Sequence, residues 1–171
     1  LAYIVSTGMD SGSLADATHF LQNHVAESYF GNEVQGLGDI NGDGLDDVLI
    51  SARRDSRVTS NGGSIVVAYG GDTDLSVPPE DRTIFAESNW DQLGYAVSEA
   101  GDPDGDGVAD FLIGAPYCDD SDANVGCAYL MSSVELDEAL AAEEATRFWG
   151  MQEAENAGMN LASAGDFDGD G

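Results

Sequence analysis

Residues 31–47 read GNEVQGLGDINGDGLDD, and the same pattern returns at residues 94–110 as GYAVSEAGDPDGDGVAD. A third copy, GMNLASAGDFDGDG, occupies residues 158–171. The leading glycines of the three copies are 63 and 64 residues apart. Self-similarity at a fixed period of this length is the mark of a repeat architecture, in which each repeat is one supersecondary unit.

Four kinds of strand-like segment recur with this period. They are short, rich in β-branched and aromatic residues, and bounded by Gly, Asp and Asn, as strands are. In order within a repeat they are residues 31–39, 94–102 and 158–166; then 47–52 and 110–115; then 2–8, 65–71 and 128–134; then 18–21, 82–85 and 146–149. A repeated unit of four short antiparallel strands describes a propeller blade. One helix-like interruption, rich in Ala, Leu and Glu, lies at residues 135–145.

The expected architecture is therefore an all-β propeller of four-stranded antiparallel blades, present as an incomplete set. Residues 1–29 would supply the third and fourth strands of one blade, 30–92 and 93–156 a complete blade each, and 157–171 the start of a further blade. A single blade cannot bury both of its faces. We therefore expect either a longer native chain with further blades, or copies that associate through the open faces and strand edges.

Three Asp-rich loops, at residues 39–47, 102–110 and 166–171, follow the first strand of each repeat. Carboxylates at alternate positions of a tight loop supply the oxygen ligands that calcium requires. Glycines at the fourth and sixth positions let the backbone fold around an ion with φ > 0. The loops contain no Cys or His, which disfavours zinc and softer metals. The sequence predicts calcium, against the alternative of Asp-Gly turns that bind nothing.

An EF-hand loop begins in the same way but ends differently. It requires a bidentate Glu at position 12 and a helix on either side. Position 12 is Ile50 in the first loop and Ile113 in the second, and both lie within strand-like segments. The sequence therefore rejects the EF-hand interpretation.

The loops, together with Phe30-Gly31 and Gly114-Ala115-Pro116, resemble the FG-GAP repeats of the integrin α-subunit propeller and its bacterial relatives. The resemblance implies that each loop joins the first and second strands of a blade. It also implies ligands at loop positions 1, 3, 5 and 9, with the carbonyl of position 7. These are Asp39, Asn41, Asp43, Leu45 and Asp47 in the first loop, Asp102, Asp104, Asp106, Val108 and Asp110 in the second, and Asp166, Asp168 and Asp170 in the third.

The charge balance is extreme, with 33 acidic residues against five arginines and no lysine, for a net charge of −28. Such a surface repels nucleic acid and anionic membranes, so neither is an expected partner. No apolar run reaches the length of a membrane helix, so membrane insertion is not expected either. The acidic residues outside the loops are interpreted as a solvated surface that keeps the chain soluble.

Cys118 and Cys127 flank the stretch 119–126 between the second and third strands of one repeat. This position predicts a disulfide across the base of a long hairpin loop, with two free thiols as the alternative. A structural disulfide implies an oxidising compartment. Calcium loops suit the same setting, so the expected location is secreted or at the cell surface.

No catalytic arrangement is evident, and the chain is not expected to be an enzyme. The two histidines, His19 and His24, would point to opposite faces of an extended strand, and neither a nucleophile triad nor a phosphate-binding loop is present. The expected function is calcium-dependent binding of an extracellular protein or glycan, as in adhesion. The alternative, by family analogy, is the propeller portion of a secreted carbohydrate-active or phospholipase-like enzyme, or a lectin.

Overall fold

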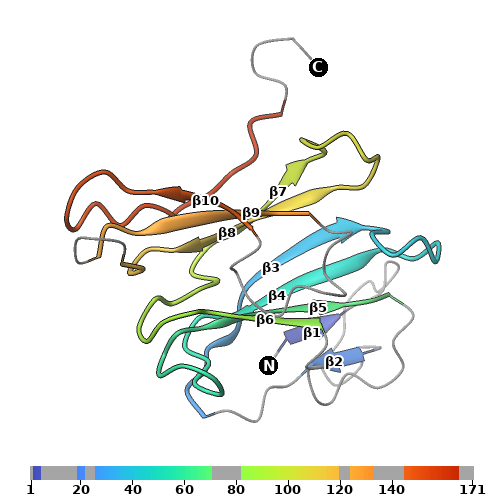
Figure 1. The fold of residues 1–171 in the computed structure, drawn as a ribbon. Coiled ribbons are helices and arrows are strands. Elements are labelled where there is room, and N and C mark those ends of the chain that lie inside the picture. The colour runs from blue at the N-terminus through green and yellow to red at the C-terminus, as the bar shows by residue number, and fades with distance from the viewer. Residues whose placement is uncertain are drawn as a thin grey trace.

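The fold consists of antiparallel strands in three sheets (Figure 1). The computed structural model describes residues 2–4, 19–21, 26–70, 82–119, 124–132 and 145–165. No α-helix occurs among these residues, and the all-β class is confirmed. Residues 135–144 of the helix-like segment fall outside the described part of the chain.

The two large sheets have the same order of strands. The first is β3 (Phe30–Gly38), β4 (Asp47–Ala52), β5 (Ser64–Ala68) and β6 (Thr83–Phe85); the second is β7 (Val97–Gly101), β8 (Asp110–Ala115), β9 (Cys127–Met131) and β10 (Thr146–Trp149). In each, every strand pairs with the next strand along the chain. A separate pair is formed by β1 (Ala2–Ile4) and β2 (His19–Leu21).

The pairing register repeats with the sequence. Val48 faces Ala68 in the first sheet, and Phe111 faces Met131, each 63 residues later, in the second. This agreement confirms that the repeating unit is a four-stranded antiparallel sheet, as in a propeller blade. The blade boundaries at residues 30, 93 and 157 stay a prediction.

The first strand of the repeat is the least regular of the four. In the second repeat it begins at Val97 rather than at Gly94, because Gly94 and Tyr95 both donate hydrogen bonds to the carbonyl of Gly114. In the third copy, residues 158–165 form no strand. A strand needs a partner to accept its ladder of hydrogen bonds. Here the N–H of Ser163 donates instead to the side-chain oxygen of Ser98, at 3.0 Å.

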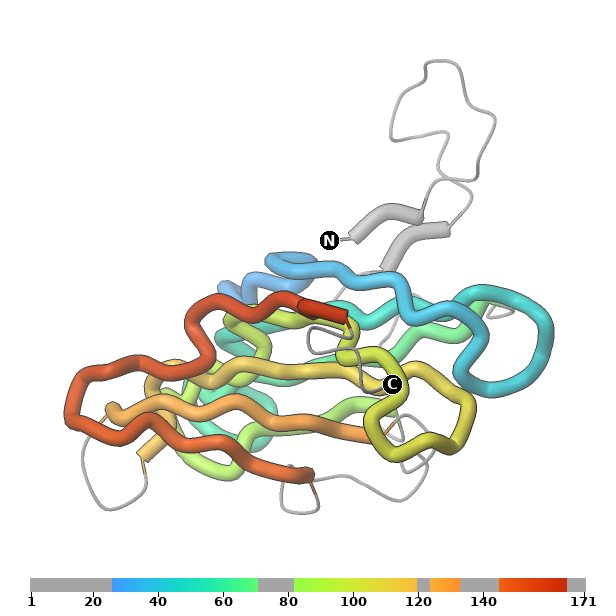
Figure 2. Tube along the Cα trace, turned by 90° about the horizontal axis from the view of Figure 1, so that it is seen from above, coloured from blue at the N-terminus to red at the C-terminus, as the bar shows by residue number. Residues whose placement is uncertain are grey.

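The core lies between the two large sheets, which are stacked as two layers (Figures 1 and 2). Leu49 and Ile65 of the first sheet are buried in one cluster with Phe111, Ile113 and Tyr129 of the second. Neighbouring residues of a strand point to opposite faces. Accordingly, a second cluster covers the other face of β4 and β5, with Phe30, Ile50, Val66 and Ala68.

The corner between the second and third strands is closed by different chemistry in the two repeats. Cys118 and Cys127 form a disulfide, with their Cα atoms 6.0 Å apart, as the sequence predicted. The residues 63 positions earlier are Asp55 and Ser64, and the hydroxyl of Ser64 donates to the Asp55 carboxylate at 2.7 Å. Arg57 completes this buried polar cluster with a side-chain hydrogen bond to the same carboxylate at 2.8 Å.

Glycine allows the chain after β10 to approach the second sheet. A Cβ added at Gly114 would lie 1.9 Å from the carbonyl oxygen of Gly158, which is a backbone atom and cannot rotate away. Gly158 itself has a φ of 81°, a conformation that costs other residues more than glycine. The packing of residue 158 on β8 therefore depends on the absence of side chains at both positions.

We predict that Gly114→Ala lowers the free energy of unfolding by about 1–3 kcal/mol, the usual cost of overpacking. The matched control is Gly36→Ala, where an added Cβ has no atom within 4 Å, and we expect a change within about 0.5 kcal/mol. Denaturant unfolding followed by intrinsic fluorescence measures both. Equal effects of the two substitutions would show that residue 158 does not pack against β8.

Candidate metal centre

The two described Asp-rich loops lie at the same end of the molecule (Figure 1). One joins β3 to β4 and the other joins β7 to β8. Each is closed at its base by a backbone pair, Gly38 with Asp47 and Gly101 with Asp110. The register shifts just before these pairs, and a bulge at such a place turns the strand and re-aims the residues that follow.

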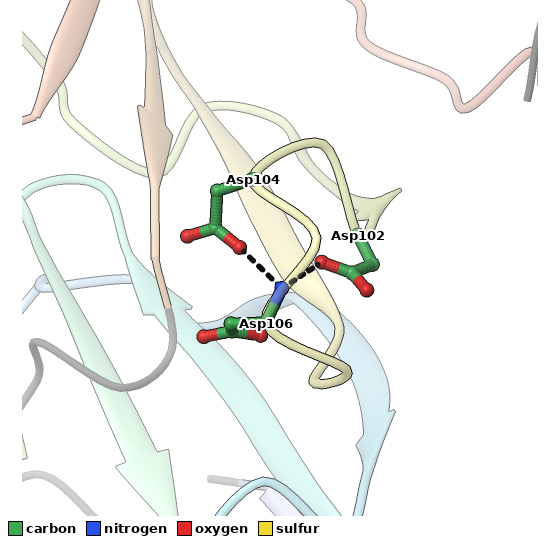
Figure 3. A group of neighbouring side chains, drawn as sticks. All are labelled: Asp102, Asp104 and Asp106. Carbon is green, nitrogen blue, oxygen red and sulfur yellow. Dashed lines mark hydrogen bonds between the residues drawn. The ribbon is translucent and has the colours of Figure 1, made fainter.

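In the second loop the first aspartate organises the backbone. One oxygen of Asp102 accepts the N–H groups of Gly105 at 2.8 Å and Asp106 at 3.0 Å, and the other accepts that of Gly107 at 2.9 Å. Asp104 accepts from the N–H of Asp106 at 3.1 Å (Figure 3), and Asp106 from that of Val108 at 2.8 Å. Hydrogen bonds from a backbone N–H to the carboxylate of an aspartate two residues earlier are typical of tight turns.

The first loop repeats this network. Asp39 accepts from the N–H groups of Gly42 at 2.8 Å, Asp43 at 3.0 Å and Gly44 at 2.8 Å. Asn41 accepts from Asp43 at 2.9 Å, and Asp43 accepts from Leu45 at 2.8 Å. Since Asn41 and Asp104 occupy the same place in the two loops, the conformation follows from the shared pattern rather than from the charge at position 3.

The fourth and sixth positions of both loops have the positive φ that the sequence predicted. Gly42 and Gly44 have φ of 78° and 90°, and Gly105 and Gly107 have φ of 78° and 92°. Residues with a Cβ are disfavoured there, whereas glycine is not. The glycines therefore allow the N–H groups to converge on the first aspartate.

The side-chain oxygens of the second loop also converge. Asp102, Asp104 and Asp106 each offer a carboxylate oxygen, and these atoms lie within 4.8 Å of one another. Figure 3 shows the three carboxylates around the turn of the loop. All three are exposed, and in water each pair of such charges repels by about 1 kcal/mol. A donor set of oxygens alone fits a hard cation such as calcium or magnesium.

The acids at position 9 are placed differently. Asp47 is fully buried and holds two segments together: its oxygens accept the N–H of Ile40 at 3.0 Å and that of Gly70 at 2.9 Å. Asp110 is also buried and lies outside the cluster of three carboxylates. A role for either carboxylate as a metal ligand stays a prediction.

The remaining predicted ligands are less informative. Leu45 is about half exposed, and Val108 packs partly against the core. Their N–H groups are engaged within the loop, and a role for their carbonyls stays a prediction. The third loop, with Asp166, Asp168 and Asp170, lies outside the described residues.

Two buried acids outside the loops escaped the sequence analysis. Burial by itself would raise the pKa of Asp55, but hydrogen bonds from the Arg57 side chain, Ser64 and the Arg57 N–H, with the Arg57 charge, hold it below its usual range. Burial raises the pKa of Asp91 to about 6, although the N–H of Ser88 favours its charged form; Asp119 and Glu87 add to the rise. Aligning the repeats would have singled out Asp55, which occupies the place of Cys118, whereas no signal marks Asp91.

Comparison with known proteins supports the same family. The family described as FG-GAP repeat matches residues 30–68, which run from β3 through the first loop to β5. Integrin alpha-5 of Xenopus laevis is 34% identical over 123 residues, which are 68% of this chain and 11% of that protein. Integrin alpha-PS2 of Drosophila melanogaster is 32% identical over 95 residues, or 52% of this chain and 7% of that protein. The chain thus spans about a tenth of the length of the curated relatives it matches.

Within the described residues, the structure contains no helix with the length and apolar character required to cross a membrane.

We predict that Asp91→Asn stabilises the protein above pH 6. Because the folded pKa of about 6 lies above the ordinary aspartate value of 3.8, the native state binds the proton more tightly than the unfolded chain does. The contribution of Asp91 to stability therefore falls as the pH rises from about 4 to about 6. The variant avoids this loss, and we expect a gain of up to about 3 kcal/mol at pH 7.5 that vanishes near pH 4.

Urea unfolding of the wild type and the variant across this pH range measures the difference. The control is Glu153→Gln, the same acid-to-amide change at an exposed site, where we expect a change within about 0.5 kcal/mol. A gain that does not depend on pH would contradict the assignment of the effect to the titration of Asp91.

Proposed function

Because this chain belongs to the FG-GAP repeat family and is integrin-like, we propose that it is a calcium-binding extracellular β-propeller module that binds a protein or glycan in adhesion. Residues 30–92 and 93–156 would each form one blade, and residues 1–29 and 157–171 would belong to blades on either side. The relatives are named as integrin alpha subunits, which favours a receptor-like role over an enzymatic one.

The observation that carries the proposal is the identical backbone network of the two loops. In each loop the side chains at positions 1, 3 and 5 lie around one turn. Their candidate metal-ligand atoms are oxygens of carboxylates and, in the first loop, of one amide. Calcium takes six to eight oxygens at 2.3–2.6 Å in flexible geometry, so the carbonyl of position 7 and the carboxylate of position 9 would add to the set. Calcium is preferred to magnesium because magnesium demands near-ideal octahedral geometry and keeps several waters.

In this proposal the residues of the loop do two things. Asp39 and Asp102 hold the backbone in a turn before any ion arrives, because both of their oxygens accept N–H groups. The Asp47 carboxylate links the base of the first loop to Gly70, just after β5, by accepting its N–H. The bound ion would supply positive charge that offsets the repulsion among the carboxylates. The loops at the opposite end of the sheets then stay free for an external partner.

An extracellular location is consistent with the other features of the chain. The Cys118–Cys127 disulfide persists in oxidising compartments. Both described loops are exposed to solvent. Extracellular calcium modules have dissociation constants of about 0.1–1 mM, so such sites are occupied where calcium is abundant. The net charge of −28 suits a protein whose surface carboxylates meet dissolved cations.

We predict that calcium raises the stability of the wild type by about 2.7 kcal/mol per site at 100 times the dissociation constant. Asp106→Ala should weaken binding at the second loop and leave the first intact, and Asp43→Ala should do the reverse. The matched control is Asp46→Ala, which removes an exposed acid of the same loop that is not a predicted ligand.

Titration calorimetry and thermal unfolding, in millimolar calcium and in chelator, give both readouts. An unchanged melting temperature between the two conditions would rule out a structural role for calcium. An effect of Asp46→Ala as large as that of Asp43→Ala would show that net charge, rather than coordination, drives the response.

We further predict that the calcium-loaded protein adheres to a surface coated with extracellular matrix proteins or glycans, and that chelator releases it. Adhesion in chelator equal to that in calcium would contradict a calcium-dependent adhesive role. The Asp106→Ala variant provides the internal comparison, since it should require more calcium for the same adhesion.

A further inference from the structure

A hollow of about 330 Å³ lies between the starts of β3 and β7 and the segment 159–161. Its polar lining consists of Asn32, Glu33, Arg53, Tyr95 and Asn160. Asn32 and Glu33 lie near the start of β3, Tyr95 just before β7 and Arg53 just after β4, at the ends of these strands opposite the Asp-rich loops. The volume is in the range of sites for small ligands, and the site is separate from the candidate metal centre.

Arg53 is held in place by neutral groups. Its Nε donates to the Asn32 side-chain oxygen at 3.2 Å, and its Nη1 donates to that of Gln92 at 3.0 Å. The guanidinium carbon lies 4.7 Å from the ring centre of Tyr29 and 5.0 Å from that of Tyr95. No carboxylate forms an ion pair with Arg53 among the residues that the structure describes. A fixed guanidinium of this kind retains donors for an external acceptor.

The other walls are also fixed by hydrogen bonds. The N–H of Glu33 donates to the hydroxyl of Ser51 at 2.9 Å, and Glu33 itself is exposed. The segment that carries Asn160 is tied to β7 by the bond from Ser163 to Ser98. The side chain of Tyr95 contacts Tyr117 edge to face, with ring centres 6.3 Å apart.

The residues of the hollow depart from the repeat that surrounds them. Gly31, Gly94 and Gly158 are kept in all three copies, but the next two positions read Asn-Glu, Tyr-Ala and Met-Asn. Arg53 likewise stands where the second repeat has Pro116. The repeat pattern therefore does not dictate the side chains that line this hollow.

We propose that this hollow binds a neutral sugar residue of a glycan. The inference deepens the adhesive function proposed above and rests on it. A hydroxyl group both donates and accepts hydrogen bonds, as do the side-chain amides of Asn32 and Asn160. Arg53 adds donors and Glu33 adds acceptors, and their charges are opposite. Val97, Met159 and Leu161 also belong to the lining, most of which is polar.

Charge decides against an acidic ligand. The chain carries a net charge of −28, and the field of such a protein lowers the local concentration of anions. An acidic peptide would gain the contact with Arg53 but meet the carboxylate of Glu33 in the same hollow. A neutral polyol meets neither penalty.

The experiment uses the calcium-loaded chain and the methyl glycosides of galactose, mannose, glucose and N-acetylglucosamine as probes. We expect saturation-transfer signals for at least one of them and a dissociation constant of about 0.1–10 mM, in line with the small number of atoms bound. Arg53→Met and Asn160→Ala should each weaken binding at least tenfold. Glu33→Gln preserves the shape of the hollow and should weaken binding less. Arg82→Met, at an arginine that stacks on Tyr69 outside the hollow, should leave it unchanged.

Absence of signal for all four glycosides would overturn the inference. So would binding that survives both Arg53→Met and Asn160→Ala in variants that retain the wild-type melting temperature, or preferential binding of a poly-glutamate peptide. If glycosides do not bind but calcium-dependent adhesion to a protein-coated surface persists, this inference fails and the proposed function stands. If calcium does not raise the melting temperature of the wild type, the proposed function fails instead.

Discussion

The central strands β4 and β5 are buried on both faces, and the rest of the structure depends on this constraint. Leu49 and Ile65 face the second sheet, while Ile50 and Val66 face the opposite way, and all four are fully buried. Each such side chain contributes about 1.5–3 kcal/mol. A sheet with two apolar faces must be covered twice, so each repeat requires neighbours. Because burial of the strands stabilises the stacked sheets, the loops at both ends of the sheets can vary in sequence and serve in binding.

The arginines of this chain stabilise the packed sheets. Every arginine lies over an aromatic ring, at 4.5–5.1 Å from its centre, and Arg147 of β10 also pairs with Glu87 of the preceding repeat. Such contacts are worth about 0.5–1 kcal/mol at exposed sites. The few cations are thus committed to packing, whereas the acids supply the loops and the solvated surface. Arg53 is the instance in which the packed cation also faces a hollow.

Much of the fold was predictable because it repeats. The bounds of β4, β8 and β10 agree with the sequence analysis, since short apolar runs between Gly and Asp leave little choice. The positive φ of Gly42 and the Cys118–Cys127 disulfide were also predictable from local patterns. The irregular course of residues 158–165 was not, because a strand is defined by its partner. The hollow at Arg53 and the raised pKa of Asp91 arise from contacts between distant residues, which no local pattern records.

The corner between the second and third strands is sensitive to different chemical conditions in the two sheets. A thiol reductant would open this corner in the second sheet and leave the first untouched, because Asp55 and Ser64 contain no sulfur. Acid acts the other way: the contribution of Asp55, whose pKa is held below its usual range, is lost only as the pH falls below that range. Two copies of one unit therefore have different chemical weak points. Neither reduction alone nor acid alone acts on this corner in both sheets.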